Sequence, residues 1–365
     1  MQYDYLIVGA GFAGCILAER LSSQLDKKIL LIDKRDHIGG NAYDSINESG
    51  IRIHHYGPHL FHTNDEQIIR YLSQFTDWHP YEHRVLAFVN GKLVPMPINR
   101  NTVNQLLKYQ YQTDEEVQGF YDRAKEEVKI INNSEDVVVS KVGRELYNLL
   151  YKGYTTKHWG IDPSQLAPSV CARLPVRTNT DERYFDDRYQ LMPLFGYSAM
   201  FDSMTSHKNI TVSLDTDYHQ IPQGAFNRLI FTGPIDEYFG FLHGILPYRS
   251  LRFEFETHSK EIYQQVAQIN YPNDYDYTRI TEFKHITGQN NSKTTVAKEY
   301  SLTTGDPFYP IPNDNNTIIY NRYKNEAQKL SSVHFVGRLA TYRYYNMDQV
   351  VAQALKTFQD IVNRL

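Results

Sequence analysis

The sequence contains little cysteine and no long hydrophobic run. Its two cysteines, Cys15 and Cys171, lie far apart, and neither has the nearby Cys or His partners of a zinc site or a disulfide framework. The longest uncharged apolar stretch, residues 5–18, contains glycines and is shorter than the roughly 18–20 residues that span a membrane. No basic segment of a signal peptide precedes it. We therefore expect a cytoplasmic protein with reduced thiols and no membrane partner.

The charged residues argue against another class of partner. The chain carries 38 Lys and Arg against 42 Asp and Glu, a formal net charge of −4, and it has no long run of like charges. This balance excludes a protein that coats nucleic acid. Tyrosine, by contrast, is abundant, with 29 among 365 residues, and much of it lies beside Arg, Asn or His. Such amphipathic rings suit the faces of sugars and bases, although they also serve ordinary packing.

The chain opens with a pattern typical of dinucleotide-binding folds. Residues 3–9 predict a strand, helical spacing follows, and residues 28–33 predict a second, buried strand, which makes one βαβ unit. In the turn, one glycine would make the bend, one would admit a pyrophosphate and one would let helix and strand close up. The acid that ends the second strand would bind a ribose. These residues are Gly9, Gly11, Gly14 and Asp33, with Phe12 inside the fingerprint.

Asp33 alone fits the adenosine ribose of either NAD or FAD, and later segments favour FAD. A second glycine pair, which ends at Gly40 and is followed by Asn41, comes soon after Asp33, as in FAD enzymes of the glutathione-reductase and amine-oxidase type. Near the end of the chain, a strand at residues 333–337 and a helix predicted from Met347 provide a second helix N-terminus for the flavin end of the cofactor.

The segment from residue 54 to residue 64 is dense in histidine. The spacing of His59 and His62 would suit a metal, but no carboxylate or Cys cluster accompanies them, so we predict no metal site. The histidines then either line a flavin, where neutral imidazoles could hydrogen-bond its edges, or pack as polar core.

Periodicity predicts two further regions. From about residue 64 to residue 150 the sequence is polar with helical spacing, clearest in residues 115–127 and 140–150. Apolar and polar side chains alternate later, in residues 250–256 and 294–300, which predicts an antiparallel sheet with one wet face. The predicted fold is therefore α/β, with a Rossmann-like FAD-binding domain, an inserted helical domain and an antiparallel β-sheet domain.

Seven segments carry a more specific signal. They are residues 39–43 (GGNAY), 56–64 (YGPHLFHTN), 153–160 (GYTTKHWG), 173–177 (RLPVR), 248–251 (YRSL), 306–310 (DPFYP) and 337–347 (GRLATYRYYNM). Together, and in this order, they closely resemble the UDP-galactopyranose mutases of bacteria. The resemblance covers essentially the whole chain.

The resemblance implies an isomerase, a flavin-dependent sugar-nucleotide mutase. Such enzymes interconvert UDP-galactopyranose and UDP-galactofuranose for galactofuranose-containing cell-surface glycans, and they use the N5 of reduced FAD to attack the anomeric carbon. The alternatives are a mutase for UDP-N-acetylgalactosamine or dTDP-fucose, an FAD-dependent oxidoreductase such as an amine oxidase, and a sugar-nucleotide sensor without catalysis. The resemblance further implies a homodimer whose flavin is reduced by NAD(P)H or another cellular donor.

The resemblance also implies three groups of site residues. Arg173, on a loop that closes over substrate, and Arg279 would flank the diphosphate and act in catalysis together with His62. The other substrate-binding residues would be His83, Tyr154, Thr155, Trp159, Tyr184, Arg249, Asn270, Tyr309 and Tyr344. The cofactor-binding residues, beyond the fingerprint and Asp33, would be Lys34, Gly40, Asn41, His59, Leu60, Arg338, Met347, Asp348, Gln349 and Val350.

We expect these parts to form three interleaved domains. The FAD-binding domain would be assembled from residues 1–78, 196–246 and 313–365. A mainly helical insertion would cover residues 100–172, and the antiparallel sheet domain that carries substrate would combine residues 79–99, 173–195 and 247–312. The substrate cleft is expected where the three domains meet over the flavin.

Overall fold

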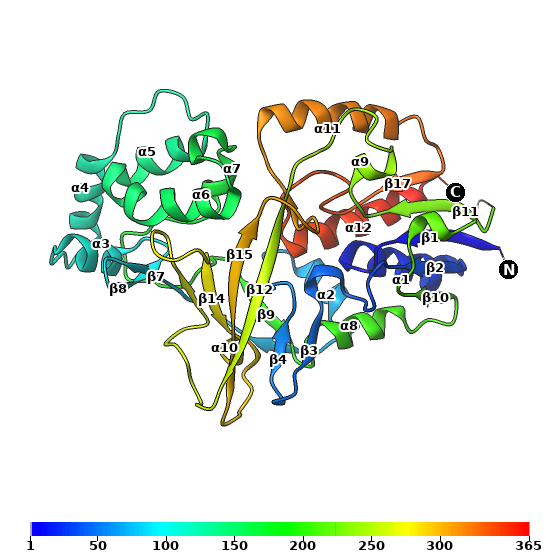
Figure 1. The fold of residues 1–365 in the computed structure, drawn as a ribbon, viewed down its shortest axis with the longest axis horizontal. Helices are drawn as coiled ribbons and strands as arrows, with labels where there is room; N and C mark the ends of the chain where they lie inside the picture. Colours follow the sequence, from blue (N-terminus) through cyan, green and yellow to red (C-terminus); the bar gives the residue numbers. More distant parts are fainter. Residues whose placement is uncertain (1, 223, 365) are drawn as a thin grey trace.

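A five-stranded parallel sheet lies at one end of the computed structural model, which describes residues 2–222 and 224–364 (Figure 1). Its neighbouring strands all run parallel, and the apolar runs of the three central strands are largely buried, as in other α/β folds. In order across the sheet the strands are β10 (Ile210–Ser213), β2 (Ile29–Ile32), β1 (Tyr3–Val8), β11 (Phe226–Phe231) and β17 (Val333–Phe335).

Three helices cover this sheet and complete the predicted Rossmann-like unit. Helix α1 (Phe12–Leu25) connects β1 to β2, and α8 (Gly196–Thr205) and α12 (Met347–Val362) pack against α1. The fold class predicted from the sequence is therefore confirmed.

A seven-stranded sheet runs through the middle of the molecule (Figure 1). Its two longest strands pair antiparallel, which confirms the strands predicted from alternation. The expectation of a wholly antiparallel sheet is wrong at one pair, because β7 and β13 are parallel and are joined by a long stretch of chain instead of a hairpin. In order the strands are β16 (Tyr309–Pro310), β12 (Tyr248–His258), β15 (Thr294–Leu302), β14 (Arg279–Glu282), β13 (Gln268–Asn270), β7 (Val85–Val89) and β8 (Lys92–Met96).

The helical region gathers at the end of the molecule opposite the parallel sheet (Figure 1). It contains α3 (Arg100–Leu107), α4 (Asp114–Ala124), α5 (Ser134–Leu146), a π-helical stretch at Tyr147–Lys152, α6 (Gly153–Trp159) and α7 (Ser169–Ala172).

The helix predicted at residues 140–150 needs two corrections. It begins at Ser134, because the side chain of Asn133 caps it by accepting a hydrogen bond from the Asp136 N–H at 2.9 Å. It also loses helical geometry at Gly143, where φ is +81°. A Cβ at Gly143 would lie 2.1 Å from the carbonyl oxygen of Ala124, so the glycine lets α5 bend where α4 ends.

Strands interrupt the region from residue 64 to residue 100, where periodicity indicated helical spacing although residues 79–99 were assigned to the sheet domain. Only α2 (Glu66–Leu72) and the start of α3 are α-helical there. Strands β7 and β8 are joined by Asn90 and Gly91, both with positive φ, a turn that suits a tight hairpin. Strand β6 (Trp78–Pro80) instead joins β5 (Phe61–Thr63) and β9 (Tyr189–Pro193) in a small sheet, so residues 173–195 add no strand to the large one.

The remaining elements are short or peripheral. They are β3 (Asp44–Ile46), β4 (Arg52–His54), α9 (Ile235–Tyr238), α10 (Phe283–Thr287), α11 (Asp314–Ala327) and three 3₁₀ turns at Gly40–Ala42, Pro163–Gln165 and Tyr218–Gln220. Within residues 2–222 and 224–364, no helix is both long and apolar enough to cross a membrane.

Two hydrophobic cores leave room for ligands between them. One core lies between the parallel sheet and its covering helices, and the other lies between the helical region and strands β7 and β8. Leu60 and Met347 pack against the first core, and Leu150 and Tyr151 belong to the second. All four side chains line one large cavity, which therefore lies where the two cores meet.

Candidate active site

A cavity of about 270 Å³ opens at the carboxyl edge of the parallel sheet, and we name it the sheet cavity. The residues that follow four neighbouring strands line it: Asp33 after β2, Gly9 after β1, Thr232 after β11 and Gly337 after β17. This edge is where open α/β sheets bind their ligands.

Glycines shape the floor of the sheet cavity. A Cβ at Gly14 would lie 1.9 Å from the Gly9 carbonyl oxygen, so only glycine lets α1 close onto β1. Gly11 faces Gly40, where an added Cβ would lie 3.1 Å from the Gly11 Cα. The two glycine turns predicted from sequence therefore meet face to face and leave their backbone accessible to a ligand.

Asp33 is held in place by backbone donors at the same edge. Its carboxylate accepts hydrogen bonds from the Ala10 N–H at 2.8 Å and from the Arg35 N–H at 3.0 Å. Asp33 is largely buried yet lines the sheet cavity, which is the position of a ribose-binding acid.

Most of the predicted cofactor residues line the sheet cavity, and four do not. Gly14 lies behind the turn, and Leu60 lines the second cavity. Asp348 and Gln349 instead cap α12, since they accept the N–H groups of Gln349 and Asn346. Those that line the sheet cavity are Gly9, Gly11, Phe12, Asp33, Lys34, Gly40, Asn41, His59, Arg338, Met347 and Val350.

A second cavity, of about 530 Å³, lies between the helical region and the seven-stranded sheet, and we name it the arginine cavity. Its walls come from α6, from β13 and β14, from residues 173–187 and from residues 338–347. The predicted residues that line it are His62, His83, Tyr154, Thr155, Trp159, Arg173, Tyr184, Asn270, Arg279, Tyr309 and Tyr344.

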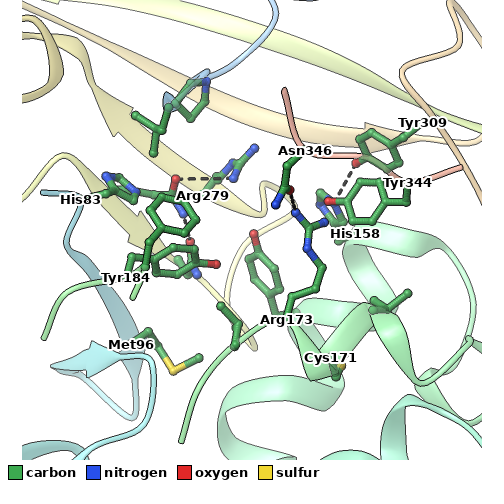
Figure 2. A pocket seen from close by; sticks show the side chains of 18 of the residues that line it. His83, Met96, His158, Cys171, Arg173, Tyr184, Arg279, Tyr309, Tyr344 and Asn346 are labelled. Carbon is green, nitrogen blue, oxygen red and sulfur yellow. Dashed lines mark hydrogen bonds between the residues drawn. The ribbon is translucent and has the colours of Figure 1, made fainter. Parts of the chain in front are cut away.

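Arg173 projects into the arginine cavity from the end of α7. Figure 2 shows its guanidinium beside Asn346 and Tyr344: it donates a hydrogen bond to the Asn346 amide oxygen, and its carbon lies 4.3 Å from the centroid of the Tyr344 ring. Among the described residues, no carboxylate pairs with Arg173. The guanidinium of Arg338 donates to the Phe308 carbonyl oxygen, and among the described residues it likewise has no carboxylate partner. Two uncompensated positive charges therefore face the cavity.

Arg279 differs from these two because it has a buried partner. Its guanidinium donates to Glu299, with Nη2 2.6 Å and Nε 2.8 Å from the same carboxylate oxygen, and Glu299 is 2% exposed. Burial opposes the charge of Arg279, but the Glu299 carboxylate outweighs that effect and raises the pKa of Arg279 above its ordinary value. Arg279 is thus fixed in place with its charge retained.

Three of the histidines that line the arginine cavity, His59, His83 and His158, are neutral at physiological pH. Burial lowers the pKa of both His59 and His83 to about 3 and holds the pKa of His158 well below its usual value. His158 Nε2 lies 2.8 Å from the Tyr309 hydroxyl, a contact drawn in Figure 2. These three imidazoles therefore add no positive charge to the cavity, in contrast to its arginines.

His62 is oriented by a carboxylate. Its Nδ1 lies 2.7 Å from Asp187, and its ring stacks on Phe185 with centroids 3.7 Å apart. Because the Asp187 carboxylate accepts the hydrogen bond, the proton of this bond lies on His62 Nδ1. The bond therefore fixes the orientation of the imidazole in the cavity wall.

Arg249 is the one predicted substrate residue that does not line the arginine cavity. It is buried, and its Nε donates to the His158 carbonyl oxygen at 3.0 Å. Its guanidinium lies against Gly160, where a Cβ would lie 2.6 Å from Arg249 Nη1. Arg249 therefore supports α6 from behind and does not reach the cavity itself.

Sequence reasoning missed the partners of the predicted residues. Four such contacts hold predicted residues in place: Arg279 with Glu299, Tyr309 with His158, Arg173 with Asn346, and His62 with Asp187. A signal existed for Glu299, because an acid on the inward face of an alternating strand needs a buried cation. His158 and Asn346 lie inside two of the family-like segments.

The two cavities meet at one set of residues. Asn41, His59, Phe308, Arg338 and Met347 line both of them. A dinucleotide in the sheet cavity would therefore present one end to a ligand in the arginine cavity. Within residues 2–222 and 224–364, no group of three His, Cys, Asp or Glu side chains is placed to hold a metal ion.

Comparisons with known proteins agree with this geometry. The UDP-galactopyranose mutase family model matches residues 149–344, and the model of an NAD(P)-binding Rossmann-like domain matches residues 7–75. The chain is 37% identical to a probable UDP-galactopyranose mutase of Klebsiella pneumoniae, over 99% of this chain and 95% of that one. It is 34% identical to a dTDP-fucopyranose mutase of Escherichia coli, over 97% of each chain. A crystal structure of a reduced UDP-galactopyranose mutase has the same fold, with a TM-score of 0.81 at 14% identity over 100% of this chain and 95% of that one.

A Rossmann-like domain whose dinucleotide cavity opens into an arginine-lined second cavity defines an enzyme that uses a bound dinucleotide on an anionic substrate. The full-length relatives then specify which enzyme. The chain belongs to the UDP-galactopyranose mutase family and is a sugar-nucleotide mutase, an isomerase.

Proposed function

We propose that this chain interconverts UDP-galactopyranose and UDP-galactofuranose, with FAD in the sheet cavity and the sugar nucleotide in the arginine cavity. The junction of the two cavities at His59, Arg338 and Met347 carries the proposal, since a cofactor in one cavity would meet a substrate in the other there. When bound and reduced, FAD would supply a nucleophilic N5 for the anomeric carbon of the sugar.

The sheet cavity supports FAD by its shape and its donors. The facing glycines Gly11 and Gly40 leave room for a pyrophosphate, and Asp33 is placed for the adenosine ribose. His59 lies at the junction as a neutral imidazole, whose Nδ1 is 2.9 Å from the Gly57 carbonyl oxygen. A neutral ring there could accept a hydrogen bond without repelling or attracting charge on the cofactor.

In this proposal Arg173 and Arg279 hold the diphosphate of the substrate. Arg173 lacks a carboxylate partner among the described residues, so the diphosphate would supply its counter-charge, whereas Arg338, at the junction of the cavities, would face the cofactor. Arg279, held by Glu299, would donate from a fixed position, and Tyr184, Tyr309 and Tyr344 add hydroxyls on the same walls. Because UDP is the leaving group, these cations would favour the cleavage of its bond to the sugar.

The glycine contact in the sheet cavity yields a test of cofactor binding. Gly40→Ala should purify with at most a tenth of the FAD of the unaltered protein, because the added Cβ would press on the Gly11 backbone and close the pyrophosphate space. The ratio of flavin to protein absorbance measures this. Gly91→Ala is the matched control: Gly91 also has positive φ, but a Cβ there meets nothing within 4 Å. Full FAD content in Gly40→Ala would refute the placement of the pyrophosphate.

A second candidate substrate is dTDP-fucopyranose, because one full-length relative is a dTDP-fucopyranose mutase. The proposed substrate predicts a kcat/KM for UDP-galactopyranose at least tenfold above that for dTDP-fucopyranose or UDP-N-acetylgalactosamine, measured on the reduced protein by anion-exchange chromatography. A higher kcat/KM for either competitor would reassign the substrate and keep the mutase. The arginine cavity argues against an amine oxidase, which needs an apolar substrate cage.

The remaining parts of the proposal follow from the family resemblance. They are a homodimer, a cytoplasmic location, reduction of FAD by NAD(P)H or another cellular donor, and the supply of galactofuranose to cell-surface glycans.

A further inference from the structure

The ammonium group of Lys157 sits in a cage of backbone carbonyls. Lys157 lies on α6, and its Nζ is 2.8, 2.9, 2.7 and 3.3 Å from the carbonyl oxygens of Tyr271, Asp274, Tyr275 and Tyr277. An ammonium has three N–H donors, so the longest contact shares one of them. Four convergent carbonyls satisfy the charge much as hydration would, as carbonyl rings do for potassium in channels.

The loop that forms the cage, residues 271–277, docks on the helical region in two further places. A Cβ at Gly153 would lie 2.5 Å from the Pro272 carbonyl oxygen and 2.5 Å from Asn273 Oδ1, so the glycine permits this close approach. The Asn273 side-chain amide also donates to the Leu149 carbonyl oxygen at 2.9 Å. The loop is therefore fastened to one short stretch of helix by a charge, a close contact and a hydrogen bond.

The contacts between residues 271–277 and the helical stretch that carries Lys157 connect two walls of the arginine cavity. The loop joins β13 to β14, and the residues at its two ends, Asn270 and Arg279, are paired across the strands and line the cavity. The helix that carries Lys157 contributes Tyr154, His158 and Trp159 to the facing wall. The contacts of the loop with α6 therefore link the strand ends that carry Asn270 and Arg279 to the wall that carries these rings.

We propose that Lys157 is a positioning residue for substrate binding: by holding the loop at residues 271–277 against α6, its ammonium presets the arginine cavity for a nucleoside diphosphate. Lys157 does not line the cavity, so it acts through Arg279 and Asn270. The inference rests on the proposed function in one respect, that the ligand carries a nucleoside diphosphate.

The test uses UDP as the probe and the oxidised, FAD-loaded protein. Lys157→Ala should raise the Kd for UDP, measured by calorimetry, at least tenfold. It should also raise KM more than it lowers kcat. The matched control is Lys152→Ala, which removes an exposed lysine from the same stretch and should leave both values unchanged.

Chemical rescue separates the ammonium from a merely structural effect. The side chain lost in Lys157→Ala corresponds to n-propylammonium, which should restore UDP binding, whereas tetramethylammonium, with the same charge and no N–H donors, should not. Lys157→Met keeps the apolar stem, so it should bind UDP as weakly as Lys157→Ala but resist rescue. If Lys157→Ala folds poorly, Lys157→Met provides the measurement of UDP affinity in its place.

Amide hydrogen exchange of residues 271–279 measures how firmly the loop is held against α6, and it requires no ligand. Exchange should accelerate in Lys157→Ala and slow again with n-propylammonium. Unchanged exchange, or a lowered Tm with unaltered UDP affinity, would overturn the positioning role. If the unaltered protein did not bind UDP, the proposed function would fail, and the exchange result would still decide the role of Lys157.

Discussion

Replacing Arg173 with alanine should lower turnover by about 100- to 1,000-fold, the loss typical of removing one preorganised donor to a developing negative charge. Arg173 faces the arginine cavity from the end of α7 with no carboxylate partner among the described residues. Its charge is therefore available to the diphosphate that must leave. FAD content should stay at its original level, because Arg173 does not line the sheet cavity.

Steady-state kinetics on the reduced protein and the flavin absorbance measure the two parts of this result. The variant should fold normally, since Arg173 is exposed and its guanidinium contacts Tyr344 and Asn346 at the cavity wall. Arg183→Ala is the control: Arg183 lies in the same stretch of chain, but its guanidinium is paired with Asp181 at 2.8 Å. Full turnover in Arg173→Ala would remove this residue from the mechanism.

Replacing Arg279 with methionine should cost stability as well as turnover. The change would leave the Glu299 carboxylate, 2% exposed, without its cation. Breaking a buried pair in this way typically costs about 3–5 kcal/mol of unfolding free energy, because the remaining charge is desolvated and unpaired. Turnover should fall as for Arg173, since the fixed donor to the diphosphate is lost.

A double variant separates the two effects. Arg279→Met combined with Glu299→Gln removes both charges, and an amide can still meet the Thr278 hydroxyl that lies 3.2 Å from Glu299. Urea unfolding should show most of the lost stability regained, while turnover stays low. A double variant as unstable as Arg279→Met would mean that the unpaired carboxylate is not the cause, and restored turnover would mean that Arg279 does not act on substrate.

Local signals in the sequence predicted most of the parallel sheet, although not its edge strand β10. The glycine fingerprint, Asp33 and the helix from Met347 depend on a few neighbouring residues, and β1, α1, β2 and α12 lie where they were expected. The helical region was harder, because tertiary contacts determine its details. Gly143 bends α5 against the end of α4, which no periodicity within the helix reveals. Residues 79–99 were assigned to the sheet domain, but the hairpin of β7 and β8 within them was not identified, although its Asn90-Gly91 turn is a strong hairpin signal.

The candidate site shows the same difference between local signals and tertiary contacts. Family-like segments identified residues that line the cavities, because those side chains lie inside contiguous motifs. Arg249 was misplaced, because a motif does not tell which face of a strand meets the cavity and which meets α6. The pairing of Arg279 with Glu299 depends on the register of β14 against β15, and Lys157 depends on a loop more than a hundred residues further along the chain. Such contacts are visible only once the strands are aligned.

The most direct measurement of the central claim compares oxidised and reduced protein on one substrate. UDP-galactofuranose is incubated with the purified FAD-loaded protein before and after reduction by dithionite, and UDP-galactopyranose is followed by anion-exchange chromatography. The account predicts conversion by the reduced protein and none by the oxidised protein. Equal conversion in both states, or none in either, would contradict a mutase that acts through reduced FAD.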